Sequence, residues 1–147
     1  MGATDQPLEL WFAERLLMRD VDLRLDTLYS AFEMIASGVT TVQHLHSRAP
    51  GDVDAVVARA GAIIGAYRDL GMRVSYSFAL RDQNRMIYAA DEHLISLLPS
   101  EARAPMAAYL GGFALPLSDQ IGVFRALRDL WATTPTVAIQ IAPANLH

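Results

Sequence analysis

The sequence predicts one domain of the α/β class, with about three parallel strands flanked by helices. Three runs rich in β-branched and aromatic residues lie at positions 39–45, 72–80 and 136–142, and segments with helical spacing of apolar residues separate them. Strands that alternate with helices favour crossover connections, which join parallel strands in one sheet. The chain has 147 residues, 52% of them hydrophobic, so it is long enough to bury a core.

Two helices are expected before the first strand. Residues 8–18 and residues 23–36 both place apolar side chains three or four positions apart, which is helical spacing. Ser37 and Gly38 follow the second segment, and glycine is typical of the position after a helix. The apolar residues that share one helix face are Leu8, Trp11, Phe12, Leu16 and Leu17 in the first segment, and Leu25, Leu28, Tyr29, Phe32 and Ile35 in the second.

The first strand is expected at Val39–Leu45, because its β-branched residues are unfavourable in a helix and fit a sheet. A long helix should follow at Val53–Leu70, with Asp52 as its N-cap and Gly71 ending it. The second strand is expected at Met72–Leu80. Its residues alternate between a larger set, Val74, Tyr76 and Phe78, and a polar set, Arg73, Ser75 and Ser77.

The region from Arg81 to Pro116 is irregular, with two shorter helical patches at Ile87–Leu98 and Glu101–Leu110. A helix at Ser118–Trp131 and a third strand at Thr136–Ala142 complete the pattern. Such alternation leaves two architectures open, an open doubly wound sheet or part of a (β/α)₈ barrel.

Composition excludes several classes of function. The net charge is −4 and the arginines are scattered, so no basic patch for nucleic acid is present. All 12 basic residues are arginine, which excludes Schiff-base lysine chemistry, and the absence of cysteine excludes disulfides and thiolate metal sites. The sequence shows neither a leader peptide nor an apolar run long enough to span a membrane, so we expect a cytoplasmic protein without a membrane partner.

The first strand-to-helix connection argues against a nucleotide-binding open sheet. Residues 43–52 hold one glycine, with no Gly-x-Gly-x-x-Gly pattern and no Walker lysine. The sequence also stops at His147, directly after its third strand, whereas a complete barrel takes eight strands and about 250 residues. Residues 1–147 are therefore expected to be an internal part of a barrel, and a small three-layer domain is the alternative.

Four segments carry a resemblance to a known family. They are Leu8–Trp11, the run Ser37–Val42 with its Ser-Gly-Val-Thr-Thr, the strand entry Gly71–Val74, and Ile141–Pro143. In this order and spacing they resemble the amidohydrolase superfamily, and most closely its branch of cytosine and S-adenosylhomocysteine deaminases and chlorotriazine hydrolases. The resemblance implies that residues 1–147 cover strands two to four of a metal-dependent barrel that hydrolyses C–N bonds, or sometimes C–Cl bonds. It implies zinc or iron in the parent family, a small-molecule substrate, and a metal that activates water.

His44 and His46 form a His-x-His pair, a pattern that metallohydrolases use at the carboxyl end of a strand. The resemblance places the metal-binding His-x-His of the family on the first barrel strand, whereas these two histidines follow Ser-Gly-Val-Thr-Thr and end the second. The family usually has aspartate at the position of His44, and its other ligands would lie beyond His147. We therefore expect no metal bound by this chain alone, and metal ligation, pocket lining and ordinary structural hydrogen bonding remain the alternatives for His44 and His46.

Further candidate substrate-binding residues follow the other two strands. Arg81, Asp82 and Asn84 come directly after the second strand, and Asn145 and His147 come after the third. In a barrel this carboxyl end of the strands is where active sites are built. A solvated loop with an internal Arg–Asp pair is the alternative for the Arg81 to Asn84 segment.

Two functions of different class remain from the sequence. The chain is part of an amidohydrolase that is inactive without the remaining barrel segments, or it is a self-contained α/β binding or interaction module without metal chemistry. A slice of a barrel would expose strand edges and apolar faces, so association through those edges is expected.

Overall fold

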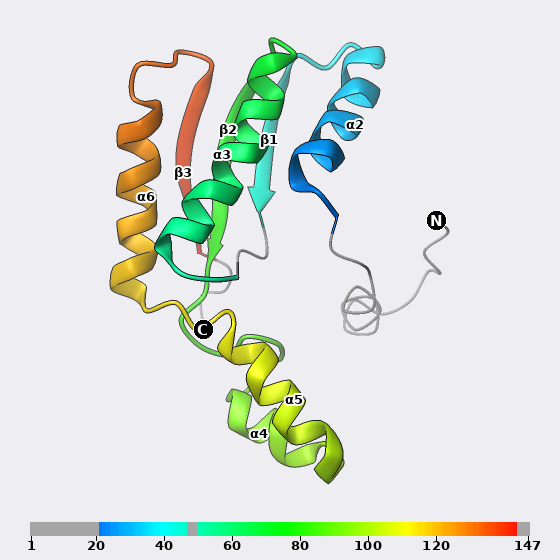
Figure 1. Ribbon diagram of the computed structural model, residues 1–147, viewed down its shortest axis with the longest axis vertical. Coiled ribbons are helices and arrows are strands. Elements are labelled where there is room, and N and C mark those ends of the chain that lie inside the picture. The colour runs from blue at the N-terminus through cyan, green and yellow to red at the C-terminus, as the bar shows by residue number, and fades with distance from the viewer. Residues whose placement is uncertain (1–20, 47–49, 144–147) are drawn as a thin grey trace.

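The computed structural model describes residues 21–46 and 50–143, which form a three-stranded parallel sheet with helices packed on it (Figure 1). The predicted α/β class and the three parallel strands are confirmed. The helix expected at residues 8–18 and the candidate residues Asn145 and His147 lie outside the described residues.

Helix α2 (Leu23–Ala36) leads into strand β1 (Thr41–His46) through a glycine-dependent helix end. The Asp22 side chain accepts a hydrogen bond from the Leu25 backbone N–H and caps the first turn. Gly38 has a φ of 84°, and the Val39 N–H donates to the Met34 carbonyl at 2.9 Å. Because this end motif still occupies Val39, the strand begins at Thr41, two residues later than the sequence predicted.

Helix α3 (Val53–Asp69) leads into strand β2 (Arg73–Leu80) in the same way. Asp52 caps its first turn by accepting from the Ala55 N–H. Gly71 has a φ of 72°, and the Met72 N–H donates to the Tyr67 carbonyl at 3.0 Å. The two helices thus end by one mechanism, and both predicted glycine stops are confirmed.

The second half of the chain holds three helices and one strand. Short helix α4 (Asp91–Leu97) and helix α5 (Ser100–Gly111) lie beyond the carboxyl end of β2, as Figure 1 shows. Helix α6 (Leu117–Trp131) then returns alongside the sheet to strand β3 (Val137–Pro143). The connection between β2 and β3 therefore carries an inserted helix pair at the carboxyl edge of the sheet.

The strands follow each other in space as they do in sequence, in the order β1, β2, β3. Thr41 pairs with Arg73 at the beginning of β1, and Val74 pairs with Val137 at the beginning of β3. The carboxyl ends of the strands consequently meet at one edge. β1 and β3 are the outer strands, and association through these edges stays a prediction.

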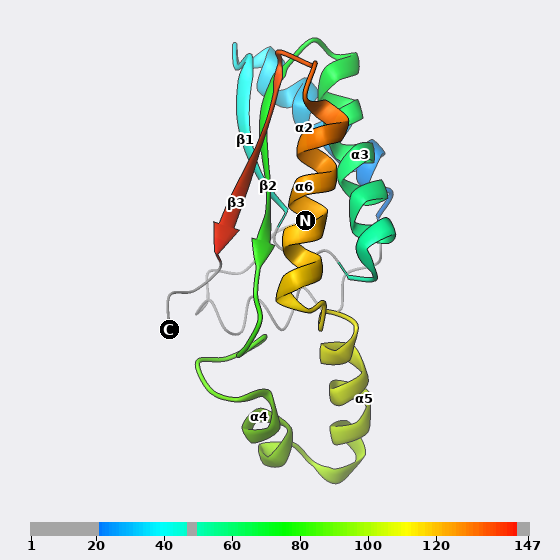
Figure 2. The same cartoon turned by 90° about the vertical axis from the view of Figure 1, so that its left-hand side faces the viewer.

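The core formed by the described residues lies on one face of the sheet. Helices α2, α3 and α6 stand on the same side of the three strands in Figure 2. Alternation along β2 sends Val74, Tyr76 and Phe78 toward these helices, and all three are almost fully buried. The residues that α3 and α6 contribute to this core are Val56, Ala60, Ile63, Ile64, Tyr67, Val123 and Leu127.

Helix α2 turns a mixed face to the core and a second apolar face to the outside. Thr27 and Ala31 are buried, Leu23 and Met34 pack against the core, and α2 packs on α3. The shared apolar face of the sequence pattern is instead exposed, by 63% at Leu25, 65% at Tyr29 and 60% at Phe32. Small residues let two helices approach closely, which favours packing the face with Thr27 and Ala31 on α3.

Candidate functional site

The face of the sheet opposite the helices mixes polar side chains with small or apolar ones such as Leu45 and Ala138. It is formed by the alternate residues of each strand, among them Gln43 of β1, Ser75 and Ser77 of β2, and Gln140 of β3. The larger residues of β2 are turned toward the helices, which leaves the small hydroxyl side chains on this side. The outer strands thus present two exposed amides, above the buried hydroxyls of the central strand.

Two glutamine side chains join across this face. The Gln43 Nε2 donates to the Gln140 Oε1 at 3.4 Å, although the two residues lie on the outer strands. In the sheet register Gln43 pairs with Ser75 and Gln140 pairs with Ser77. Because both central residues are serines, the amides can meet above them without a steric clash.

The two serines beneath this bridge have different partners. The Ser77 hydroxyl lies 3.5 Å from the His44 carbonyl, to which it donates. The Ser75 hydroxyl is buried and has no hydrogen-bond partner among the described residues. A buried polar atom without a partner is costly, so Ser75 is a point at which a ligand or a neighbouring side chain could contribute a bond.

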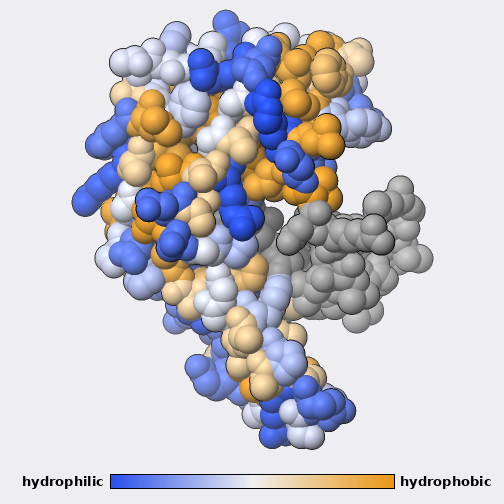
Figure 3. All heavy atoms as spheres, viewed as in Figure 1, coloured by the Kyte–Doolittle hydropathy of each residue, from blue (hydrophilic) through white to orange (hydrophobic). Residues whose placement is uncertain are grey.

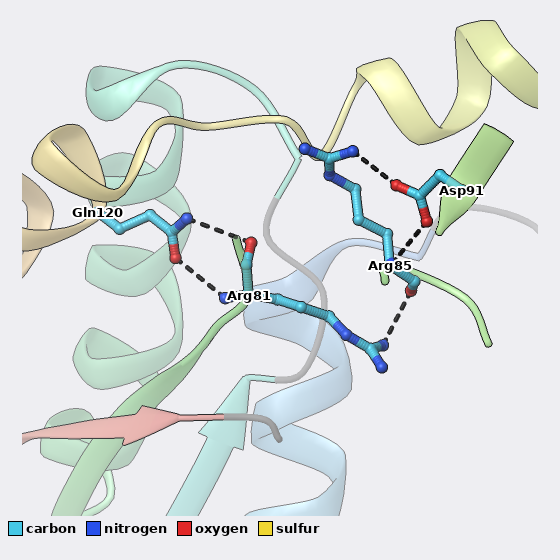
Figure 4. Close-up of polar contacts among 4 residues, drawn as sticks. All are labelled: Arg81, Arg85, Asp91 and Gln120. Atoms are coloured by element: carbon cyan, nitrogen blue, oxygen red, sulfur yellow. Dashed lines mark hydrogen bonds and ion pairs between the residues drawn. The ribbon is translucent and has the colours of Figure 1, made fainter. Parts of the chain in front are cut away.

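A second polar region lies at the carboxyl end of β2, where Gln120 of α6 holds the strand end (Figure 4). The Arg81 backbone N–H donates to the Gln120 Oε1 at 3.1 Å, and the Gln120 Nε2 donates to the carbonyls of Arg81 and Leu115 at 3.3 and 2.7 Å. Gln120 is almost fully buried. A single amide therefore satisfies three backbone groups where the sheet ends.

The loop that follows is closed by an ion pair. Arg85 Nη1 lies 2.6 Å from Asp91 Oδ2, and the Arg85 backbone N–H donates to the other carboxylate oxygen at 2.7 Å. The Arg81 guanidinium reaches the Arg85 carbonyl at 2.8 Å, as Figure 4 also shows. The ion pair of this loop thus joins Arg85 and Asp91, two residues outside the Arg81 to Asn84 segment, while Asp82 is exposed.

Asn84, also a candidate from the sequence, has a φ of 52° and is half-buried. Asparagine tolerates this left-handed backbone better than most residues. The backbone conformation alone therefore explains why an asparagine stands at this position, whether or not it binds a ligand.

His44 and His46 lie on the helix-covered face of the sheet, each beside a tyrosine. The Nδ1 atom of His44 is 3.1 Å from the hydroxyl of Tyr67 in α3, and that of His46 is 2.8 Å from the hydroxyl of Tyr76 in β2. The rings of His44 and Tyr76 are stacked. The structure brings the two histidines together with two tyrosines, an arrangement that suits structural hydrogen bonding.

Burial sets the electrostatics of this cluster. Removal from water lowers the pKa of His44, and the negative charge of Asp26 opposes part of that shift. Burial likewise raises the pKa of Tyr67, with a further contribution from Asp26, and raises that of Tyr76. All three side chains are therefore neutral at pH 7, and they act here as uncharged hydrogen-bonding groups.

The sequence pattern missed several of these polar residues. Gln43 and Gln140 are three-dimensional neighbours separated by most of the chain, and Gln120 caps a strand end from another element. The alternation of Ser75 and Ser77 in the second strand was the one available signal for a polar face. Nothing local to Asp91 distinguishes its carboxylate from that of Glu92.

The zinc or iron centre implied by the family resemblance finds no ligand set in the part of the chain that the structure describes. No group of three or more His, Cys, Asp or Glu side chains there is arranged to hold a metal ion. His44 and His46 already use their Nδ1 atoms on tyrosine hydroxyls. The described residues do not fit such a centre, and no reaction step is derived through it.

Comparisons of the chain with protein-family models, curated proteins and solved structures found no match. Among the helices formed by residues 21–46 and 50–143, none is long and apolar enough to cross a membrane.

Proposed function

We propose that this chain supplies three consecutive β/α units, strands two to four, of a barrel-type amidohydrolase. The reaction would be hydrolysis of a C–N bond in an amide, an amidine or an amino-substituted heteroaromatic ring. The single observation that carries the proposal is the polar, helix-free face of a parallel sheet, bridged by Gln43 and Gln140. The chain alone is then inactive, because the rest of the barrel is needed.

The arrangement of helices supports a barrel over a doubly wound sheet. In a barrel all helices lie on the outer face and the inner face of the sheet is lined by side chains. A doubly wound sheet has helices on both faces and reverses its strand order at the ligand site. In the described residues the helices lie on one face and the order β1, β2, β3 does not reverse.

The glutamine bridge supports the substrate class. Each glutamine amide offers two donor hydrogens and one acceptor oxygen. After the bond between them, the Gln43 carbonyl and the Gln140 amino group remain able to bond a ligand. An amide or amidine presents a matching donor and acceptor side by side, so these two residues would orient it. They are binding residues in this proposal, and the water-activating chemistry belongs to segments outside this chain.

The coding sequence on both sides of this chain gives the first test. We expect a His-x-His upstream and strands that carry two further histidines and an aspartate downstream. The 147-residue chain, purified alone, should retain no stoichiometric zinc or iron by elemental analysis. One tightly bound metal per chain would contradict the proposal.

The second test uses the complete protein. Ammonia release from amides, amidines and aminotriazines should be measured for Gln43→Leu and Gln140→Leu beside Thr41→Ala, a variant of the same face near the amino end of β1. Loss of a substrate hydrogen bond should raise KM roughly tenfold in the glutamine variants, with a smaller effect on kcat. Equal kcat and KM values in the two glutamine variants and in Thr41→Ala would show that the bridge does not bind the substrate.

The alternative function is a self-contained binding module. It would be identified by flanking sequence without barrel strands, together with a monodisperse 147-residue chain that unfolds in one sharp transition. In that case the glutamine face would bind a ligand without hydrolysing it.

A further inference from the structure

Helix α2 carries an exposed apolar stripe that the core does not use. The stripe consists of Leu25, Tyr29, Phe32 and Ile35, which lie three or four positions apart. Figure 3 shows apolar side chains gathered over this helix. A contiguous apolar surface of this kind marks a place where another element packs.

The chain itself provides a segment of matching character directly before α2. Residues 8–18 have apolar side chains at helical spacing, with Trp11, Phe12 and Leu16 on one face. Only residues 19–22 connect this segment to α2, whose N-cap is Asp22. In helical hairpins, a connection this short joins two helices that pack as antiparallel neighbours.

The lengths of the two surfaces also agree. At 1.5 Å per residue, a helix over residues 8–18 would be about 16 Å long, and the stripe from Leu25 to Ile35 spans about 15 Å. The opposite side of α2 is already occupied, because Thr27 and Ala31 are buried in the packing on α3. A neighbouring antiparallel helix would therefore meet the stripe.

We propose that residues 8–18 form a helix that docks antiparallel on the apolar stripe of α2. In this pairing Leu16 lies opposite Leu25, and Phe12 lies opposite Tyr29. The partner surface is thus a segment of the same chain rather than a second copy. The inference is independent of the hydrolase proposal, since it concerns a surface remote from the glutamine bridge, and either can fail without the other.

Tryptophan fluorescence tests the docking directly. The chain has two tryptophans, so Trp131→Phe leaves Trp11 as the reporter. We expect Trp11 emission to be blue-shifted and less quenched by acrylamide than in a peptide of residues 1–20. Phe32→Asn in this background should shift the emission toward that of the peptide, whereas the control Leu97→Asn, at a site 67% exposed on α4, should not.

Phe32 is exposed in the described fold, so its replacement should leave the core intact, and far-ultraviolet circular dichroism checks this. Crosslinking is the second measurement, because the native chain has no cysteine. The pair Phe12→Cys and Tyr29→Cys should close an intramolecular disulfide at low protein concentration, and Phe12→Cys with Leu97→Cys should not.

Two outcomes would overturn the proposal. If acrylamide quenches Trp11 fluorescence as strongly in the chain as in the free peptide, the stripe is not covered by this segment. Protection of Trp11 that disappears on dilution, with disulfides that form only between molecules, would assign the stripe to a second copy.

Discussion

The side-chain amide of Gln43 in the first strand bonds that of Gln140 in the third at 3.4 Å, across a strand that contributes only serines beneath them. The contact joins the two outer strands on the face opposite helices α2, α3 and α6. The two faces of β2 differ in side-chain size. One carries the large residues of the core, and the other carries the small residues that lie beneath the contact. Substitutions on the two faces should consequently have different effects.

Removal of the Ser75 hydroxyl should stabilise the isolated chain. Within residues 21–46 and 50–143 the buried Ser75 Oγ has no hydrogen-bond partner, so Ser75→Ala removes an uncompensated polar atom and should raise the free energy of unfolding by about 1 kcal/mol. Ser77→Ala is the matched control, because its hydroxyl donates to the His44 carbonyl and its loss should be neutral or destabilising. Urea unfolding midpoints, compared at a constant m-value, show which of the two variants is more stable.

Stability should decrease in mildly acidic solution through His44. Burial lowers the pKa of His44 in the folded chain below its usual 6.5, so the unfolded chain binds a proton more readily. The contribution of His44 is then complete above pH 6.5 and is lost as the pH falls from 6.5 through the lower folded pKa. Urea unfolding between pH 5 and pH 8 should show this loss, and His44→Gln should reduce its slope. An unchanged slope in the variant would refute the assignment.

Breaking the Arg85–Asp91 pair should loosen the loop at the carboxyl edge. Asp91→Asn leaves a largely buried guanidinium without its counter-charge, which should cost roughly 2 to 3 kcal/mol. Amide exchange should accelerate in residues 81–97 more than in the strands. Asp129→Asn breaks the exposed pair with Arg128 and should change stability by less than about 0.5 kcal/mol, so similar effects of the two variants would contradict this prediction.

Gln120 should be needed to keep the end of β2 in place. Gln120→Ala removes the partner of the Arg81 N–H and of two carbonyls, and we expect a loss of roughly 3 kcal/mol. Ser118→Ala, an exposed change in the same first turn of α6, serves as the control. Thermal unfolding of both variants measures the difference, and equal transitions would show that other contacts hold the strand end.

The local pattern of the chain was enough to predict the elements of the fold. Glycine at positions 38 and 71 can adopt a positive φ at little cost, so both helices end where the sequence indicates, and alternation in β2 identified the buried set Val74, Tyr76 and Phe78. These features depend on backbone preference and on the period of side chains along a strand. Such properties belong to neighbouring residues and can be read without knowledge of the rest of the molecule.

Tertiary packing alone decided which face of each element is buried. The spacing of His44 and His46 places both side chains on one side of β1, but the tyrosines of α3 and β2 determine that this side is the covered one. The apolar stripe of α2 is likewise exposed because the face with Thr27 and Ala31, flanked by Leu23 and Met34, packs on α3 and the core. Periodicity defines the faces of a helix or strand, whereas burial depends on the shape and chemistry of elements that are distant in the sequence.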